Sequence, residues 1–370
     1  MHEGEFAVTG DLVTRLVAAR FPRWAGLPVT PVASSGTVNA LFRIGTDLVV
    51  RLPRVDWSLG DIETEATWLP LLAPRLPVAI PEQLGIGLPA EGYPWPWAVY
   101  RWLPGTVPVE GTLTDPLGLA ADLAGFVRAM RAVDPGASGR HRDGAGQEPG
   151  DPGTSGRHRD GAGRAPGDAG TSGRHRDGAG QAPGGPGTSG RHRDGAGQEP
   201  GDPWLDPPAA YRGGGHSALD PPAREALAGL AGLLDPAELA AIGAALDADL
   251  VAVPDYAGPP VWLHADLMPG NLLVDPRGRL AAVIDFATLG VGDPSCDLIV
   301  AWNLLTPEAR EVFRAALDAD DQTWRRGRGR ALAMAVIALV YYHQTNPAFA
   351  DNARYVIREV LEACDPTKTG

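Results

Sequence analysis

The segment VWLHADLMPGNLLV, residues 261–274, places three polar side chains between two apolar stretches. Asp266 and Asn271 lie five residues apart, and Asp285 follows fourteen residues later in AAVIDF. In phosphoryl transfer, one carboxylate orients a hydroxyl and takes its proton, while an amide oxygen and a second carboxylate hold Mg²⁺ against phosphate oxygens. These residue types in this order indicate a nucleotide-phosphate site.

The elements around these residues indicate how they could meet. Apolar strands flank a loop that Pro269 and Gly270 interrupt, and two strands, 271–275 and 279–285, are expected to turn at DPRG. Asn271 and Asp285 then stand at the ends of one hairpin. A lone His264-x-Asp266 pair would be interpreted as a turn that caps its own backbone, but the full set is more specific than that.

The rest of the chain divides into two regions. Residues 1–102 mix strands and helices: strands 38–44 and 47–52 alternate around Gly45-Thr46 as a hairpin, 60–73 has helical spacing, and 96–102 is a further strand. Residues 103–135 and 204–370 are mainly helical, with predicted helices at 115–133, 222–234, 236–250, 295–305, 307–319, 328–343 and 347–363.

Composition limits the functional classes. The formal charge of −13 and the pI near 5.0 argue against a nucleic-acid partner and leave room for a cationic small substrate. Two cysteines in no metal-binding spacing suggest a reduced compartment. The N-terminus does not read as a signal peptide, and the most apolar run, 331–342, is too short to cross a bilayer. We expect a soluble, cytoplasmic protein without a membrane partner.

A seventeen-residue unit rich in Gly, Pro and Arg occurs four times between residues 136 and 203. It contains no Leu, Ile, Val, Met or aromatic residue, so it cannot bury apolar surface to offset the entropy of ordering. Its Arg-His-Arg-Asp tetrads could be taken for a metal or phosphate site. A disordered loop that can be deleted with little loss is the preferred interpretation, because stackable repeats need an apolar face.

Longer segments carry a resemblance to a known family. HADLMPGN and IDF resemble the catalytic and metal-binding loops of protein-kinase-like enzymes. SSGTVNALFRIG, LVVRLPR, YPWPWAVYRWLPG and GVGDPSCDLIVAW are similar to the aminoglycoside phosphotransferase family, from roughly residue 20 to residue 360. The resemblance implies a bilobal α+β fold: an N-lobe with a small antiparallel sheet at 1–102, a mainly helical C-lobe at 103–370, and the repeats as a disordered insertion.

The resemblance also assigns roles. Asp266 becomes the catalytic base that engages the substrate hydroxyl, and Asn271 and Asp285 become the Mg²⁺ ligands. His264 would be structural. Asp297 in CDL resembles a buried Asp that ties the catalytic loop to the helix beneath it, although a carboxylate favoured by the dipole at a helix start explains it equally well.

On the nucleotide side, kinase-like folds place a lysine on the third strand, paired with a helical Glu. Here LVVRLPR supplies Arg51, and the only lysine of the chain is Lys368 in the C-terminal tail. Arginine can hold phosphate oxygens with its fork, with a different reach from lysine. An ordinary strand charge is the alternative. Glu65 is preferred as its partner over Glu63, which could be a solvated helix residue.

Two further contacts with the nucleotide follow from the resemblance. SSGTVNA would lie over the phosphates, with Ser35, Gly36 and Thr37 offering backbone N–H groups and hydroxyls. At the hinge, the Tyr100 carbonyl and the Trp102 N–H would meet the base edge.

Two positions depart from the family pattern. Ala265 stands where kinases carry Arg and many relatives Gly, and Ala287 follows Asp285-Phe286 where Gly is usual. Neither change removes a ligand. Ala287 could limit the flexibility of the metal loop, because alanine tolerates positive φ poorly.

The expected activity is transfer of the γ-phosphoryl group of ATP or GTP, with Mg²⁺, to a hydroxyl of a small molecule, most closely an aminoglycoside-like aminosugar. Antibiotic resistance and metabolism are both open as its role. Macrolide, choline-like or sugar kinases are alternatives, as is a catalytically silent nucleotide-binding scaffold. Four acidic residues could line the binding site of a cationic substrate: Glu308, Asp318, Asp320 and Asp321. A solvated helix face or a helix start explains their positions better than substrate contact does.

Overall fold

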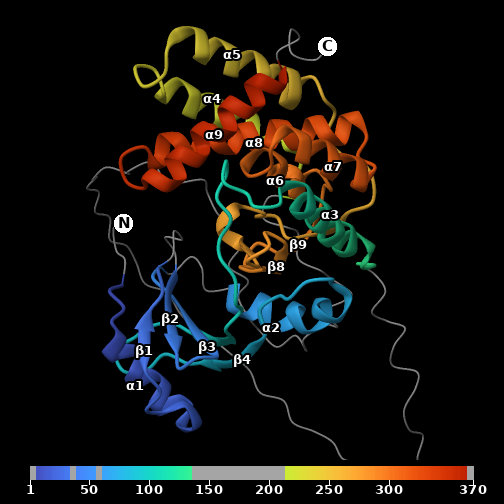
Figure 1. Cartoon of the computed structure of the whole chain (residues 1–370). Helices are drawn as coiled ribbons and strands as arrows, with labels where there is room; N and C mark the ends of the chain where they lie inside the picture. The colour runs from blue at the N-terminus through green and yellow to red at the C-terminus, as the bar shows by residue number, and fades with distance from the viewer. Residues whose placement is uncertain (1–5, 34–38, 56–60, 136–212, 365–370) are drawn as a thin grey trace, which may run out of the picture. The chain divides into compact units, whose positions relative to one another are not determined.

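The structure, a computed structural model, describes residues 6–33, 39–55, 61–135 and 213–364 (Figure 1). The repeats at 136–203 and the predicted phosphate-loop residues Ser35, Gly36 and Thr37 lie outside these ranges. The N-terminal region contains helices α1 (Gly10–Arg20) and α2 (Asp61–Leu72) and the strands β1 (Val29–Pro31), β2 (Asn39–Ile44), β3 (Leu48–Pro53), β4 (Gln83–Gly87) and β5 (Trp97–Arg101).

These strands form one antiparallel sheet in the order β1-β2-β3-β5-β4. The predicted hairpin is confirmed, because β2 and β3 pair from Asn39↔Pro53 to Ile44↔Leu48. Alternate residues of β2 are buried, since one face of the sheet packs with the apolar residues of α1. This sheet presents Arg51 of β3 and Tyr100 of β5 on neighbouring strands.

Helix α2 has a buried stripe with helical spacing, formed by Ile62, Glu65, Trp68, Leu69 and Leu72. Its apolar end packs into the core of the C-terminal region, where the rings of Trp68 and Trp262 lie 4.7 Å apart. The helix therefore belongs to the N-terminal region by sequence but shares its core with the C-terminal helices.

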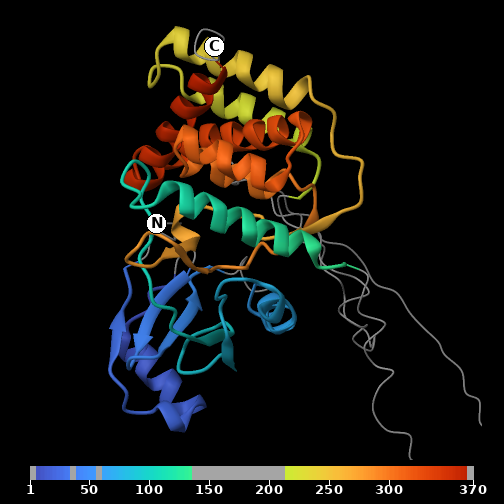
Figure 2. The same ribbon diagram turned by 45° about the vertical axis from the view of Figure 1, so that its right-hand side comes forward.

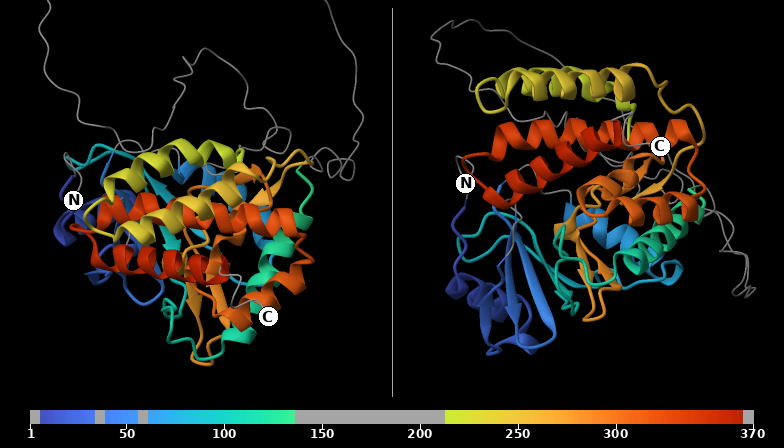
Figure 3. Two further views of the ribbon diagram at one scale, coloured as in Figure 1. Left: turned by 90° about the horizontal axis from the view of Figure 1, so that it is seen from above. Right: turned by 45° about the horizontal axis from the view of Figure 1, so that its top comes forward.

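The C-terminal region is helical, as predicted (Figure 2). Helices α8 (Asp321–Tyr342) and α9 (Pro347–Cys364) pack along one another, and α4 (Asp220–Gly229) and α5 (Pro236–Leu246) lie against them (Figure 3). Helix α8 begins at Asp321 rather than near residue 328, because Asp320 caps its N-terminus and ion pairs accommodate its arginine-rich first turns. The helices are α3 (Pro116–Ala132), α4 (Asp220–Gly229), α5 (Pro236–Leu246), α6 (Val300–Asn303), α7 (Pro307–Leu317), α8 (Asp321–Tyr342) and α9 (Pro347–Cys364).

Two short sheets carry the motif loops. Strand β6 (Val261–Leu263) pairs with β9 (Gly290–Gly292), and β7 (Leu272–Val274) pairs with β8 (Leu280–Val283), which confirms the second predicted hairpin. The segment after β5 is fixed to this hairpin by two backbone hydrogen bonds between Thr106 and Val274, of 2.8 and 3.0 Å. Within the described residues, no helix combines the length and apolarity that a membrane span requires.

Candidate active site

The loop between β6 and β7 is held in a strained conformation by one buried carboxylate. Ala265 has φ = 65°, a left-handed value that costs a residue with a Cβ about 1 kcal/mol or more. Asp297 accepts hydrogen bonds from the N–H groups of His264 (3.0 Å) and Ala265 (2.8 Å), one with each oxygen. Asp297 is therefore the tie between the loop and the helix beneath it, rather than only a charge at a helix start.

His264 is fully buried, and both of its ring nitrogens have backbone partners, one in the loop and one after β8. Nδ1 accepts from the N–H of Asp266 at 3.2 Å, so Nε2 carries the proton that it donates to the Ile284 carbonyl at 3.0 Å. The ring also meets Phe286 edge-on, with centroids 4.6 Å apart. This arrangement agrees with the structural role predicted for His264.

Asp266, Asn271 and Asp285 converge at one end of the β7–β8 hairpin. The side-chain nitrogen of Asn271 donates to the Asp266 carboxylate (3.0 Å) and to its carbonyl (2.8 Å). The N–H of Ile284 donates to the Asn271 carbonyl at 2.9 Å, so Asp285 comes one residue beyond this pair. Neither hydrogen bond of the Asn271 side chain uses its Oδ1, and the Asp285 side chain is 42 % exposed.

Arg51 faces this hairpin from the N-terminal sheet. Two of its nitrogens lie 2.9 Å from the two oxygens of Glu65, and the third contact is to Asp285 at 3.4 Å. Glu65 also accepts from the N–H of Phe286 at 3.1 Å and from the Tyr100 hydroxyl. Of the two glutamates considered, it is therefore Glu65 that pairs with Arg51, and its carboxylate joins α2, β3 and the segment that follows β8.

The electrostatics of this cluster follow from burial and from an excess of carboxylates. Burial raises the pKa of Glu65, and Arg51 opposes that rise. Burial disfavours the charged guanidinium of Arg51, but Glu65, Tyr100 and Asp285 together raise its pKa above the ordinary value. The guanidinium is therefore always charged.

Asp61, at the start of α2, is a member of this cluster that the sequence analysis did not select. Burial raises its pKa to about 7; Arg51 opposes the rise, and Asp285 and Glu65 add to it. An acidic residue in the first turn of a helix is ordinary, so nothing in the sequence distinguishes it. Its place relative to Asp285 depends on how α2 packs.

The structure places the predicted hinge residues Tyr100 and Trp102 at the end of β5. The N–H of Trp102 donates to the Asp47 carbonyl at 2.8 Å, and Tyr100 is paired with Val49 of β3 and Gln83 of β4. The N–H of Trp102, which was expected to meet a base edge, is thus already used within the protein. Tyr100 reaches the site through its side chain, with the hydroxyl on Glu65 and the ring 5.3 Å from the Arg51 guanidinium.

The two departures from the family pattern have different outcomes. Among the described residues outside glycine, φ is positive at Ala265 and Asp285 in this region, but not at Ala287. Ala287 therefore does not adopt the positive φ that alanine tolerates poorly, whereas Ala265 does. Among those residues, no three His, Cys, Asp or Glu side chains gather closely enough to hold a metal ion by themselves.

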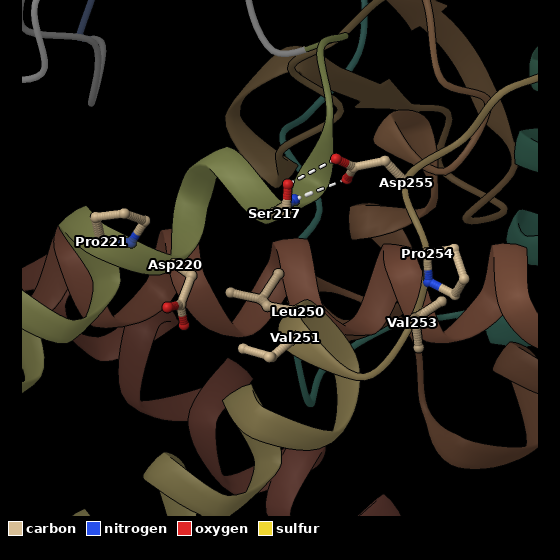
Figure 4. Close-up of a pocket in the computed structure, with 8 residues that line it drawn as sticks. All are labelled: Ser217, Asp220, Pro221, Leu250, Val251, Val253, Pro254 and Asp255. Atoms are coloured by element: carbon tan, nitrogen blue, oxygen red, sulfur yellow. Dashed lines mark hydrogen bonds between the residues drawn. The ribbon is translucent and has the colours of Figure 1, made fainter.

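A hollow of about 380 Å³ lies elsewhere, on the C-terminal helices (Figure 4). Its polar groups are engaged with the protein: Asp255 accepts from the N–H (3.0 Å) and hydroxyl (2.6 Å) of Ser217, and Asp220 pairs with Arg224. It contains none of the residues described above. The residues that line it are Ser217, Asp220, Pro221, Leu250, Val251, Val253, Pro254 and Asp255.

A small antiparallel sheet followed by a helical region, with a loop of His-x-Asp-x₄-Asn, defines a bilobal protein-kinase-like fold. The model of the APH family, described as the phosphotransferase enzyme family, matches residues 29–332. The chain belongs to this family. A comparison with curated proteins finds no match.

Solved structures of the same fold include enzymes for different antibiotics. The GDP and kanamycin complex of APH(2″)-IIia is 16% identical, with a TM-score of 0.63, and the match covers 95% of this chain and 99% of that one. The ADP-bound aminoglycoside phosphotransferase APH(2″)-Ib is 12% identical (TM-score 0.51; 96% and 99%). The macrolide 2′-phosphotransferase MphH from Brachybacterium faecium is 19% identical (TM-score 0.51; 94% and 98%). At these identities the likeness concerns the fold alone.

Proposed function

We propose that this protein transfers the γ-phosphoryl group of a nucleoside triphosphate to a hydroxyl group of a small molecule, most closely an aminosugar. The observation that carries the proposal is the convergence of Asp266, Asn271 and Asp285 at one end of the hairpin, with Arg51 reaching Asp285 from the other region. Membership of a phosphotransferase family supports it, as do nucleotide complexes among structures of the same fold.

In this mechanism, Asp266 orients the acceptor hydroxyl and receives its proton as the oxygen attacks the γ-phosphorus atom. The bond from that phosphorus to the β–γ bridging oxygen breaks, and the nucleoside diphosphate leaves with this oxygen. The hydrogen bond from Asn271 holds the Asp266 carboxylate in one orientation. Arg51, fixed by Glu65, offers its positive charge to the phosphate oxygens. Alignment of the acceptor oxygen with the phosphorus atom contributes further to the rate.

Magnesium fits the residues that are present. Asn271 Oδ1 and the exposed Asp285 carboxylate are oxygen donors, and the surrounding cluster holds more carboxylates than guanidinium groups. Protein sites bind Mg²⁺ through one or two such donors together with substrate phosphates, so two ligands are sufficient here. When bound, the ion would neutralise charge on the phosphate oxygens.

The contact with the base needs a backbone donor other than Trp102. Leu103 follows Trp102 in the segment after β5. Its N–H has no hydrogen-bond partner in the described part of the chain, so it can donate to a base. We assign the role of hinge donor to this group, because successive N–H groups of an extended segment point in opposite directions, so the N–H of Leu103 points away from Asp47.

The acceptor class rests on charge and on the fold relatives. Two of the acidic residues considered as its wall are used by the protein: Asp320 accepts from Thr323 at the start of α8, and Asp321 pairs with Arg314. Asp318 ends α7 in a left-handed conformation. These uses favour the helix-end interpretation. The net charge of −13 still favours a cationic aminosugar, and a macrolide is the second candidate because MphH shares the fold.

The test is nucleotide turnover with Mg²⁺, ATP or GTP, and a panel of aminoglycosides, macrolides and amino-alcohols. Turnover that depends on one acceptor class should fall about 10²- to 10⁴-fold in Asp266→Ala. The control is Asp275→Asn, in the turn of the same hairpin, where the amide oxygen can still accept from the N–H groups of Arg277 and Arg279. If no acceptor stimulates turnover, or if Asp266→Ala retains it, the proposed activity is wrong.

A further inference from the structure

Several peptide groups near Asp266 have an identifiable hydrogen-bond partner, and one of these partners has no role so far. Asp297 holds the N–H groups of His264 and Ala265, and Thr288 donates to the His264 carbonyl. The carbonyl of Leu267, the residue after Asp266, accepts from Asn303 Nδ2 at 3.0 Å. The same nitrogen lies 3.1 Å from the sulfur of Met268.

Asn303 is an unusual residue for its surroundings. It is 2 % exposed at the end of α6, a helix of one turn whose other members are all buried. A buried amide is costly unless its polar atoms are used, and a leucine of similar size would pack there without that cost. Nδ2 is used, whereas Oδ1 has no partner in the part of the chain that the structure describes. The physical gain from an amide at this position is therefore its donor to the loop.

A second amide holds the first. Asn352 of α9, itself 9 % exposed, donates from Nδ2 to the main-chain carbonyl of Asn303 at 2.8 Å. The last carbonyls of a helix lack partners within the helix, and α6 is too short to stabilise itself. Two successive hydrogen bonds thus lead from α9 through the end of α6 to the residue next to Asp266.

We propose that Asn303 is a positioning residue that fixes the position of Asp266. Asn352 in turn fixes the position of Asn303 through the hydrogen bond to its main-chain carbonyl. The proposal rests on the proposed function, in which Asp266 is the base. Displacing the base by about 1 Å lowers the rate of transfer far more than it lowers nucleotide affinity, because the nucleotide is held by other residues. The effect should therefore appear in kcat and not in the nucleotide KM.

The variants are Asn352→Ala, Asn303→Leu and the matched control Tyr355→Phe. The Tyr355 hydroxyl also donates from α9, to the Leu305 carbonyl at 3.3 Å, but leads to no residue of the loop. We expect Asn352→Ala and Asn303→Leu to lower kcat by about 10- to 100-fold with the nucleotide KM within twofold. Tyr355→Phe should lower the melting temperature to a similar degree and leave kcat unchanged. Equal kcat in Asn352→Ala and Tyr355→Phe would overturn the proposal.

Two further measurements separate this proposal from the proposed function. Combining Asn352→Ala with Asp266→Ala should lower residual turnover no further than Asp266→Ala alone; additive losses contradict positioning through Asp266. Amide hydrogen exchange of residues 264–271, measured on the ligand-free protein, should be faster in Asn352→Ala than in Tyr355→Phe. Because exchange does not require turnover, it tests the proposal even if no acceptor is found, and equal exchange in the two variants refutes it.

Discussion

Two buried ion clusters in this protein look alike by burial but differ in composition and surroundings. In the C-terminal region, Asp249 is fully buried and bound by two arginines of α8: Arg325 at 3.1 Å and Arg328 at 2.6 and 3.1 Å. In the other cluster, Arg51 is shared between Glu65 and Asp285, with Asp61 as a further neighbour. One cluster has more guanidinium groups than carboxylates; the other has more carboxylates.

The difference indicates which cluster can do chemistry. At Asp249 the carboxylate is enclosed. The excess positive charge of this cluster is exposed to solvent at Arg325, whose side chain is 40 % exposed. Around Arg51, the excess negative charge meets solvent at Asp285, which is 42 % exposed. An accessible excess of carboxylates attracts a cation, whereas an excess of guanidinium groups around an enclosed carboxylate repels one and here joins helices. Burial alone does not mark a site, and the exposures of Arg325 and Asp285 are similar, so the sign of the unbalanced charge distinguishes the two clusters.

The largest expected effect tests the cluster assigned a structural role. Asp249→Ala leaves two guanidinium groups without their carboxylate, so we expect the free energy of unfolding to fall by about 3 kcal/mol, at the low end for breaking a buried pair because both arginines reach solvent. Urea unfolding measures the loss. The nucleotide KM of the folded variant should stay unchanged, and a raised KM would contradict the contrast between the clusters.

The next effect tests the other cluster with a change that keeps its charge. Arg51→Lys removes the fork that reaches both Glu65 and Asp285, so kcat/KM for the nucleotide should fall about tenfold. The free energy of unfolding should fall by less than the loss of about 3 kcal/mol expected from breaking a buried pair, because lysine keeps one ion pair to Glu65 and leaves no buried charge unpaired. Arg328→Lys is the matched control at Asp249 and should leave kcat/KM unchanged. Wild-type kinetics in Arg51→Lys would mean that only the charge matters.

The sequence was sufficient for the parts of the site that are local in the chain. Asp266, Asn271 and Asp285 belong to one loop and one hairpin, so their spacing already predicts their proximity. Glu65 could be preferred over Glu63 because it lies three residues after Ile62 and four before Leu69, on the buried stripe of α2. The hairpin β2–β3 and the course of the C-terminal helices were predictable for the same reason.

What the sequence could not provide depends on strand register and on packing between distant elements. Whether the N–H of Trp102 is free to bind a nucleotide base depends on the register in which β5 pairs with β3. The pattern of side chains in β5 does not reveal that register. Asn303 and Asn352 are 49 residues apart and look like isolated polar residues in apolar helices. Asp61 looks like any acidic residue at a helix start, and only the docking of α2 brings it to Arg51.

The smallest expected effect concerns Asp61, the carboxylate that adds to the negative charge around Arg51. Folding raises the pKa of Asp61 from 3.8 to about 7, so the folded state binds the proton more tightly than the unfolded state. Its contribution to stability is therefore fully present below about pH 4 and is lost as the pH rises through 7. Asp61→Asn cannot ionise. Relative to wild type, it should show no gain in unfolding free energy near pH 4 and a gain of about 1 kcal/mol near pH 8, allowing for solvent screening.

Urea unfolding across this pH range, without nucleotide or metal, measures the gain, and Glu63→Gln controls for the loss of one negative charge from the same helix. Glu63 is exposed, so it lies outside the buried cluster. If the free energy of unfolding rises equally in both variants above pH 7, the net charge of the protein explains the result. The cluster around Arg51 would then have no destabilising excess of carboxylates. A gain confined to Asp61→Asn means that carboxylates are crowded around Arg51. Because Mg²⁺ would relieve such crowding at Asp285, adding Mg²⁺ with nucleotide should then reduce the difference between Asp61→Asn and wild type.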